Sequence, residues 1–213
     1  MLRPSDVLFA VTEAKKYNTD YSINISGGTL GSADESINYL SDIVRQIRER
    51  FYGSISIECV PPQNLQLINE LHNAGATAII MNLEIYDEML RKEVCPGKST
   101  ISRDFYFNSL RFAVSVFGRG NVSSVLIMGV QPDDDVLTAA KELINLGVIP
   151  TVMPFKPLDD TEMEKYPLPN PTNYVRISQC VAQMMHDNGL TINPCSGCAS
   201  CGACSLEIDL NNR

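Results

Sequence analysis

Residues 122–153 read VSSVLIMGVQPDDDVLTAAKELINLGVIPTVM, and this stretch decides the fold class. The β-branched runs at 122–128 and 148–153 each predict a strand. Residues 133–146 between them carry apolar side chains at helical spacing, and their acidic first turn suits the positive end of a helix. Two strands joined through one helix predict a βα unit of a parallel sheet.

The same alternation continues outward in both directions from this unit. Further strands are expected at 21–25, 54–58 and 77–81. Further helices are expected at 4–17, 33–51, about 62–73 and 102–117, and at 171–187 after a Pro-rich loop. The repeated order predicts an α/β fold with five visible strands. A curved, barrel-like sheet is favoured over a Rossmann sheet, because no G-x-G-x-x-G motif follows the first strand.

Composition and charge exclude several classes of function. The chain has 213 residues, of which 44% are hydrophobic and 20% charged, so it can bury a sizeable core. Its net charge of -8 argues against general binding to nucleic acid or to anionic membranes. No apolar run approaches the roughly 18 residues of a membrane span, and the start lacks the pattern of a signal peptide. A cytoplasmic location is therefore expected.

Four of the seven cysteines lie close together near the C-terminus, at Cys195, Cys198, Cys201 and Cys204. In a reducing compartment such a cluster indicates metal binding rather than disulfides. Three contiguous C-x2-C steps favour a [4Fe–4S] cluster over zinc, which usually takes two separated pairs. Three of the four can also ligate with a remote Cys180 or Cys95 completing the set. The expected organisation is a barrel-like body at 1–188 and a Cys-rich tail at 189–213.

Polar or small residues follow three of the expected strands, at the edge where an α/β barrel places its site. Gly27-Gly28-Thr29 lets a ligand approach the backbone. Asn82 and Glu84, spaced two apart on a segment expected to be extended, would point the same way and hold a ribose diol. The segment from Ile127 to Gly129 offers an apolar wall for a flat base.

The stretch from Ile23 to about Asp160 resembles the radical S-adenosylmethionine (SAM) superfamily, in its biotin synthase-like branch. Ser26-Gly27-Gly28-Thr29 is similar to the family's glycine-glycine-glutamate motif, with Thr29 in place of the acid. The resemblance implies a partial (βα)6 barrel that binds SAM, with an iron–sulfur cluster and a small-molecule substrate. It implies that the motif ending in Thr29 meets the methionine amino group and that Asn82-Leu83-Glu84 contacts the ribose.

The resemblance also covers the adenine and carboxylate ends of SAM. Residues 124–129, which include Ile127 and Gly129, look like the segment beside adenine. Lys98 and Arg103 are both similar in placement to the basic residue that meets the SAM carboxylate, and either can fill that role. Glu58 would face the substrate side.

The sequence departs from this family in one motif. Radical SAM proteins carry C-x3-C-x2-C after their first strand, and neither that motif nor that strand is found here. The family's reaction is reductive cleavage of SAM to a 5′-deoxyadenosyl radical, so the chain is expected to bind SAM but to be inactive alone. An open edge of the parallel sheet is expected as well, and it would offer a template for a protein partner.

Two other functions are compatible with parts of the sequence. One is a non-catalytic metal-binding or electron-transfer subunit, in which the αβ body is a docking platform for the Cys-rich tail. The other is acid–base hydrolysis through Glu58 and Glu84. It is disfavoured because the chain has two histidines and neither a Ser–His–Asp nor an H-E-x-x-H arrangement.

Overall fold

Five short parallel strands form one sheet in chain order in the computed structural model, which describes residues 3–17, 22–193, 206 and 210. The strands are β1 (Ile23–Ser26), β2 (Ile55–Glu58), β3 (Ala78–Ile80), β4 (Val122–Met128) and β5 (Ile149–Pro154). The expected five-stranded parallel α/β fold is confirmed. Because each strand pairs with the next along the chain, β1 and β5 are the edges of the sheet.

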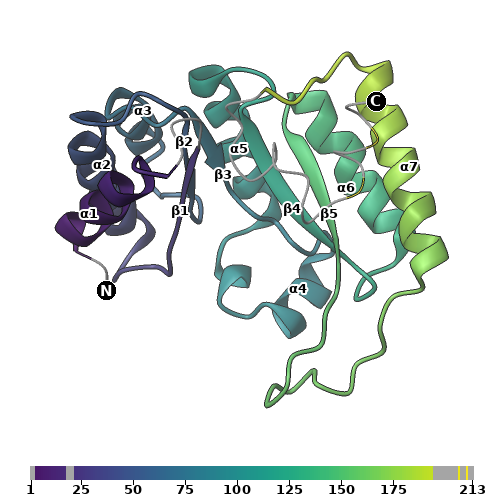
Figure 1. Cartoon of the computed structure of the whole chain (residues 1–213). Coiled ribbons are helices and arrows are strands. Elements are labelled where there is room, and N and C mark those ends of the chain that lie inside the picture. Colours follow the sequence, from purple (N-terminus) through teal and green to yellow (C-terminus); the bar gives the residue numbers. More distant parts are fainter. Residues whose placement is uncertain (1–2, 18–21, 194–205, 207–209, 211–213) are drawn as a thin grey trace.

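Seven α-helices and one short 3-10 helix accompany this sheet within the described residues (Figure 1). They are α1 (Pro4–Ala14), α2 (Ala33–Arg48), α3 (Gln66–Asn73), α4 (Glu88–Val94), η1 (Lys98–Thr100), α5 (Arg103–Phe117), α6 (Asp133–Leu146) and α7 (Pro171–Asp187). In Figure 1, α4 and the long connection after β5 lie at the end of the sheet where the strands finish. That end is the one from which an α/β fold builds its site.

The two faces of β1 and β2 differ in polarity, as strand alternation requires. Ile55 and Ile57 are fully buried and belong to the core beneath the helices. Ser56 and Glu58 alternate with them, and the Ser56 hydroxyl donates to Asn24 Oδ1 at 2.7 Å. The sheet therefore has one face packed on helices and another that carries polar groups.

Helix α2 begins where its sequence supplies a complete capping box. Ser32 Oγ accepts from the backbone N–H of Glu35 at 3.2 Å, and the Glu35 carboxylate accepts from Ser32 N at 2.8 Å. Gly31 precedes the cap with φ +62°, and a Cβ there would lie 2.2 Å from Glu35 Oε2. The turn from β1 into α2 therefore needs glycine at this position.

The helices expected at 4–17 and 33–51 end earlier, at Ala14 and Arg48, and two further local expectations differ more from the structure. The helix expected at about 62–73 begins only at Gln66, because Asp34 Oδ1 accepts from Gln63 N at 2.7 Å and holds the preceding residues against α2. Helix α4 was not expected, since its seven residues are too short for a clear periodicity. Asp87 starts it by accepting from Leu90 N at 2.7 Å.

No helix among the described residues has the length and apolar content that a membrane span requires.

Candidate functional site

A cleft of about 710 Å³ opens at the carboxyl ends of β1, β2 and β3. We call it the rim cleft. Its lining residues follow those strands or lie on α2 and the segment around η1: Thr29, Gly31, Ser32, Ala33, Val60, Gln63, Glu84, Cys95, Pro96, Gly97, Lys98, Thr100 and Ile101. Thr29 and Glu84, far apart in sequence and both expected in the site, therefore share one cavity.

Glu84 is the acidic residue of the rim cleft. Its Oε1 lies 2.5 Å from Lys98 Nζ, and the two side chains are 25% and 29% exposed. The Cys95 thiol lies 3.5 Å from Glu84 Oε2 and donates to it. Lys98 thus shares a cleft with Glu84 and is placed to exchange this partner for the anionic group of a ligand.

Cys95 presents a thiol to the cleft. Burial, together with the nearby Glu84 carboxylate, raises the pKa of this thiol to about 11. The thiol is therefore protonated at neutral pH and acts as a hydrogen-bond donor rather than as a nucleophile.

Asn82 does not line the rim cleft. Its Nδ2 donates to Glu58 Oε1 at 2.7 Å, and its Oδ1 accepts from Val125 N at 3.1 Å. The expected extended segment is wrong at Glu84, whose φ is +65°. Asn82 joins β2 to β4 in this structure, and its contact with a ribose stays a prediction.

The two glycines after β1 lie at a different cavity from Thr29. Gly27 and Gly28 line an apolar cavity of about 250 Å³ together with Val7, Ile25 and α2 side chains. A Cβ on either glycine would meet nothing within 4 Å. The space that the sequence predicted beside them exists, at the open edge of β1 where a protein partner was expected. That partner stays a prediction.

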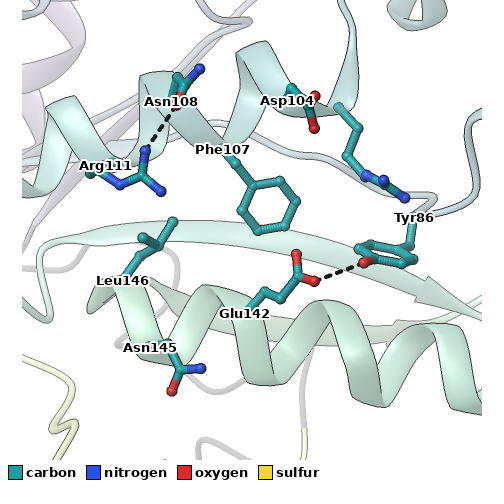
Figure 2. A pocket seen from close by; sticks show the side chains of 9 residues that line it. Tyr86, Asp104, Phe107, Asn108, Arg111, Glu142, Asn145 and Leu146 are labelled. Atoms are coloured by element: carbon teal, nitrogen blue, oxygen red, sulfur yellow. Dashed lines mark hydrogen bonds between the residues drawn. The ribbon is translucent and has the colours of Figure 1, made fainter.

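Arg103 lines a second cavity, of about 530 Å³, between α5 and α6. Its guanidinium lies 4.5 Å from the centre of the Tyr86 ring. Figure 2 shows the Tyr86 hydroxyl directed at Glu142, to which it donates at 2.8 Å. Of the two basic residues named for the SAM carboxylate, only Lys98 lines the cleft that holds Glu84 and Thr29.

The segment expected beside adenine lies close to the loop after β5. Ile127 is half-buried, and its carbonyl accepts from Gln131 Nε2 at 2.7 Å. Gly129 has φ +97°, and a Cβ there would lie 2.7 Å from the Pro169 side chain. The loop therefore covers Gly129, and neither residue lines the rim cleft.

A buried cation lies behind the cleft wall. Arg91 on α4 is 1% exposed and donates through Nη2 to the carbonyl of Ile101. Its Nε and Nη1, and the hydroxyl of Tyr106, have no hydrogen-bond partner among the described residues. The guanidinium lies 5.2 Å from the Tyr106 ring centre, and burial raises the pKa of that phenol. The Arg91–Tyr106 pair thus packs behind the part of the wall that contains Ile101.

The cysteine run at Cys195, Cys198, Cys201 and Cys204 lies outside the described residues. Within the described part, no group of three His, Cys, Asp or Glu side chains is placed to hold a metal ion. The tail therefore stays the predicted metal site.

Sequence reasoning missed Gln63, Arg91 and Gln131 around this site. Their roles depend on contacts between distant segments, such as the bond from Gln131 to the carbonyl of Glu84, which spans 47 residues. The Pro96-Gly97 pair could have marked the turn that places Lys98, because such pairs interrupt helices.

Comparison with known proteins supports the fold and a distant relationship. No protein-family model matches the sequence. A bacteriochlorophyllide c C-7(1)-hydroxylase from Chlorobaculum limnaeum is 26% identical over 132 residues, which cover 61% of this chain and 33% of the hydroxylase. The chain thus spans a third of that curated relative's length.

Three solved structures share the fold. HydG, a maturase of the [FeFe]-hydrogenase, matches with a TM-score of 0.69 at 14% identity, over 86% of this chain and 43% of HydG. A radical SAM methyltransferase from Sphaerobacter thermophilus matches with a TM-score of 0.64 at 17% identity, over 90% of this chain and 57% of the methyltransferase. The radical SAM enzyme HemN from Escherichia coli, a coproporphyrinogen III oxidase, matches with a TM-score of 0.60 at 19% identity, over 85% of this chain and 44% of HemN. The expected partial barrel is therefore confirmed, and this chain spans about half of each of these proteins.

Proposed function

We propose that this chain is the SAM-binding body of a radical SAM iron–sulfur protein of the biotin synthase-like branch. One observation carries the proposal: Thr29, Glu84 and Lys98 line a single cleft at the carboxyl ends of a parallel sheet. Its volume of about 710 Å³ falls in the range of small-molecule sites. The fold shared with radical SAM enzymes is a second support.

The donor and acceptor groups of the rim cleft fit SAM. The Glu84 carboxylate accepts hydrogen bonds from ribose hydroxyls, and the Lys98 ammonium pairs with the ligand carboxylate. The hydroxyls of Thr29 and Thr100 can meet its amino group. Binding separates the Glu84–Lys98 pair, and each partner gains a group of the ligand in exchange. Lys98 takes this role rather than Arg103, because Arg103 is stacked on Tyr86 in the other cavity.

The Cys-rich tail is proposed to hold a [4Fe–4S] cluster through Cys195, Cys198, Cys201 and Cys204. Four closely spaced thiolates are the donor set that such clusters take. In this family a reduced cluster supplies the electron for cleavage of SAM. The sequence has no C-x3-C-x2-C motif, so we propose that these 213 residues bind SAM without cleaving it.

The first experiment measures SAM binding by equilibrium dialysis, with 5′-methylthioadenosine as the comparison ligand because it lacks the amino-acid end. Lys98→Met is expected to weaken SAM binding about tenfold, since one charge-assisted hydrogen bond is lost, and not to weaken the binding of 5′-methylthioadenosine. Lys92→Met, an exposed lysine on α4, is the matched control. Absence of saturable SAM binding would overturn the proposal and favour the docking-platform function.

The second experiment counts iron, acid-labile sulfide and zinc per chain after anaerobic purification. About four iron and four sulfide, lost on Cys198→Ser and Cys201→Ser, are expected for one cluster. About one zinc without sulfide would contradict the cluster. Release of 5′-deoxyadenosine by the isolated chain with dithionite would contradict the proposed inactivity.

Because the hydroxylase that is similar in sequence acts on a bacteriochlorophyllide, tetrapyrroles are the first substrate class to titrate.

A further inference from the structure

Glu84 holds its carboxylate in the rim cleft with a backbone conformation that non-glycine residues seldom adopt. Its φ is +65°, and only one other described non-glycine residue, Asp160, has a positive φ. Such a conformation persists where surrounding contacts over-determine it. The contacts that hold Glu84 therefore decide where its side chain points.

Two backbone hydrogen bonds attach Glu84 to β4. Its N–H donates to the carbonyl of Val125 at 2.8 Å, and its own carbonyl accepts from Ile127 N at 2.8 Å. These bonds form an isolated bridge opposite Leu126, beyond the end of β3. They fix Glu84 relative to β4, but not the path of the chain that leaves toward Tyr86.

The side-chain amide of Gln131 makes three further hydrogen bonds around the Glu84 turn. Its Nε2 donates to the carbonyl of Glu84 at 2.9 Å and to that of Ile127 at 2.7 Å. Its Oε1 accepts from the backbone N–H of Tyr86 at 2.8 Å. Gln131 is 5% exposed, so these bonds form away from water, and its amide spans both sides of the Glu84 turn.

We propose that Gln131 is a positioning residue for Glu84, whose backbone turn it locks so that the carboxylate is directed into the rim cleft. The three bonds require an amide. Nε2 donates to two carbonyls while Oε1 accepts from one N–H, and a side chain with donors and an acceptor at the same end is needed to make all three at once. The inference rests on the proposed function, in which Glu84 contacts the ligand.

Gln131→Glu tests this positioning role. The variant keeps the shape of the side chain, but an acceptor oxygen replaces the Nε2 donor that faces the carbonyls of Glu84 and Ile127. Gln131→Met, which has neither donor nor acceptor, is the second variant if the first does not fold by circular dichroism. Gln179→Glu makes the same chemical change at an exposed position of α7 and is the matched control.

The first readout needs no ligand. It is the rate at which iodoacetamide alkylates Cys95 at pH 9, resolved by mass spectrometry. Burial raises the pKa of Cys95 first, and the Glu84 carboxylate 3.5 Å from its Sγ adds to that rise. Release of the Glu84 turn moves this carboxylate away, so more of the thiol ionises and alkylation is expected to speed up about threefold to tenfold. In a Glu84→Gln background the Gln131 change should add nothing, because the carboxylate is already gone.

The second readout is SAM affinity, expected to fall about tenfold because the binding-competent turn is less populated. An unchanged alkylation rate of Cys95 in the Gln131 variants would overturn the inference. An equal rise of that rate in the Glu84→Gln background would overturn it as well, because it would show a general loosening of the fold around Cys95. If wild-type chain fails to bind SAM while Cys95 responds as expected, the proposed function fails and the positioning role of Gln131 stands.

Discussion

Replacing Asn82 should destabilise the fold far more than an ordinary surface change, because this amide joins two strands. Asn82→Ala removes a charge-assisted bond to Glu58, worth about 1.5–3 kcal/mol, and leaves the Val125 N–H without its acceptor, at about 1–3 kcal/mol. Since Glu58 is only half-buried and water can replace part of the loss, we expect about 3 kcal/mol in total.

Urea unfolding followed by far-ultraviolet circular dichroism measures this loss. Asn38→Ala, an exposed asparagine on α2, is the control and should cost less than about 1 kcal/mol. A loss for Asn82→Ala no larger than that of the control would refute the structural role of Asn82.

Asn82→Asp tests the same contact through pH. The new carboxyl would lie at hydrogen-bond distance from Glu58 Oε1, and two carboxylates so close do not both ionise readily. Their pKa values are therefore raised, so the variant is least stable near neutral pH and regains stability as the pH falls and one of them takes a proton. A deficit relative to wild type that does not change with pH would contradict the Asn82–Glu58 contact.

Three further predictions concern the cleft and its surroundings. Glu84→Gln and Lys98→Met in a double-mutant cycle should show a coupling of about 1 kcal/mol in urea unfolding, since the pair is partly exposed, and strictly additive losses would contradict the ion pair. Burial raises the pKa of Cys59 from 9.0 to about 12, so the thiol ionises more readily in the unfolded chain. The free energy of unfolding of the wild type should therefore fall as the pH rises across that range, by up to about 1.4 kcal/mol per pH unit. Cys59→Ala should flatten this decline, and the same slope in the variant would contradict the role of Cys59. Gly129→Ala should cost about 3 kcal/mol of stability, because φ is positive there and the new Cβ would lie 2.7 Å from Pro169 in the loop after β5. Gly189 also has a positive φ but open space around it, so Gly189→Ala should cost only about 1 kcal/mol. Equal losses of the two variants in thermal unfolding would rule out the loop contact.

The expected helices and strands were largely found because their signals are local. The strand at 122–128 and the helices at 133–146 and 171–187 have the expected bounds. Each has a clear periodicity and a cap or breaker at its ends, and both act within a few residues. The start of α3 was missed because it depends on the contact of Gln63 with Asp34 on another helix. Helix α4 was missed because it is short and begins with a single capped turn at Asp87.

The candidate site was predicted in part. Thr29 and Glu84 share the rim cleft, as the rule that strand ends meet at one edge predicts. Lys98 and Arg103 could not be separated from the sequence, since both follow the same strand at similar distances. The stacking of Arg103 on Tyr86 is a contact across the second cavity, and no spacing rule contains it.

By itself, the sequence determined that this protein is a parallel α/β fold and that polar groups gather where its strands end. Those properties follow from hydrophobic periodicity, which is a property of neighbouring residues. Only the tertiary structure decided that Asn82 is engaged with Glu58 while Glu84 reaches the cleft, because that choice depends on β4 and Gln131, more than 40 residues away. Burial gives such distant partners their strength, since a polar group removed from water must find its hydrogen bonds within the fold.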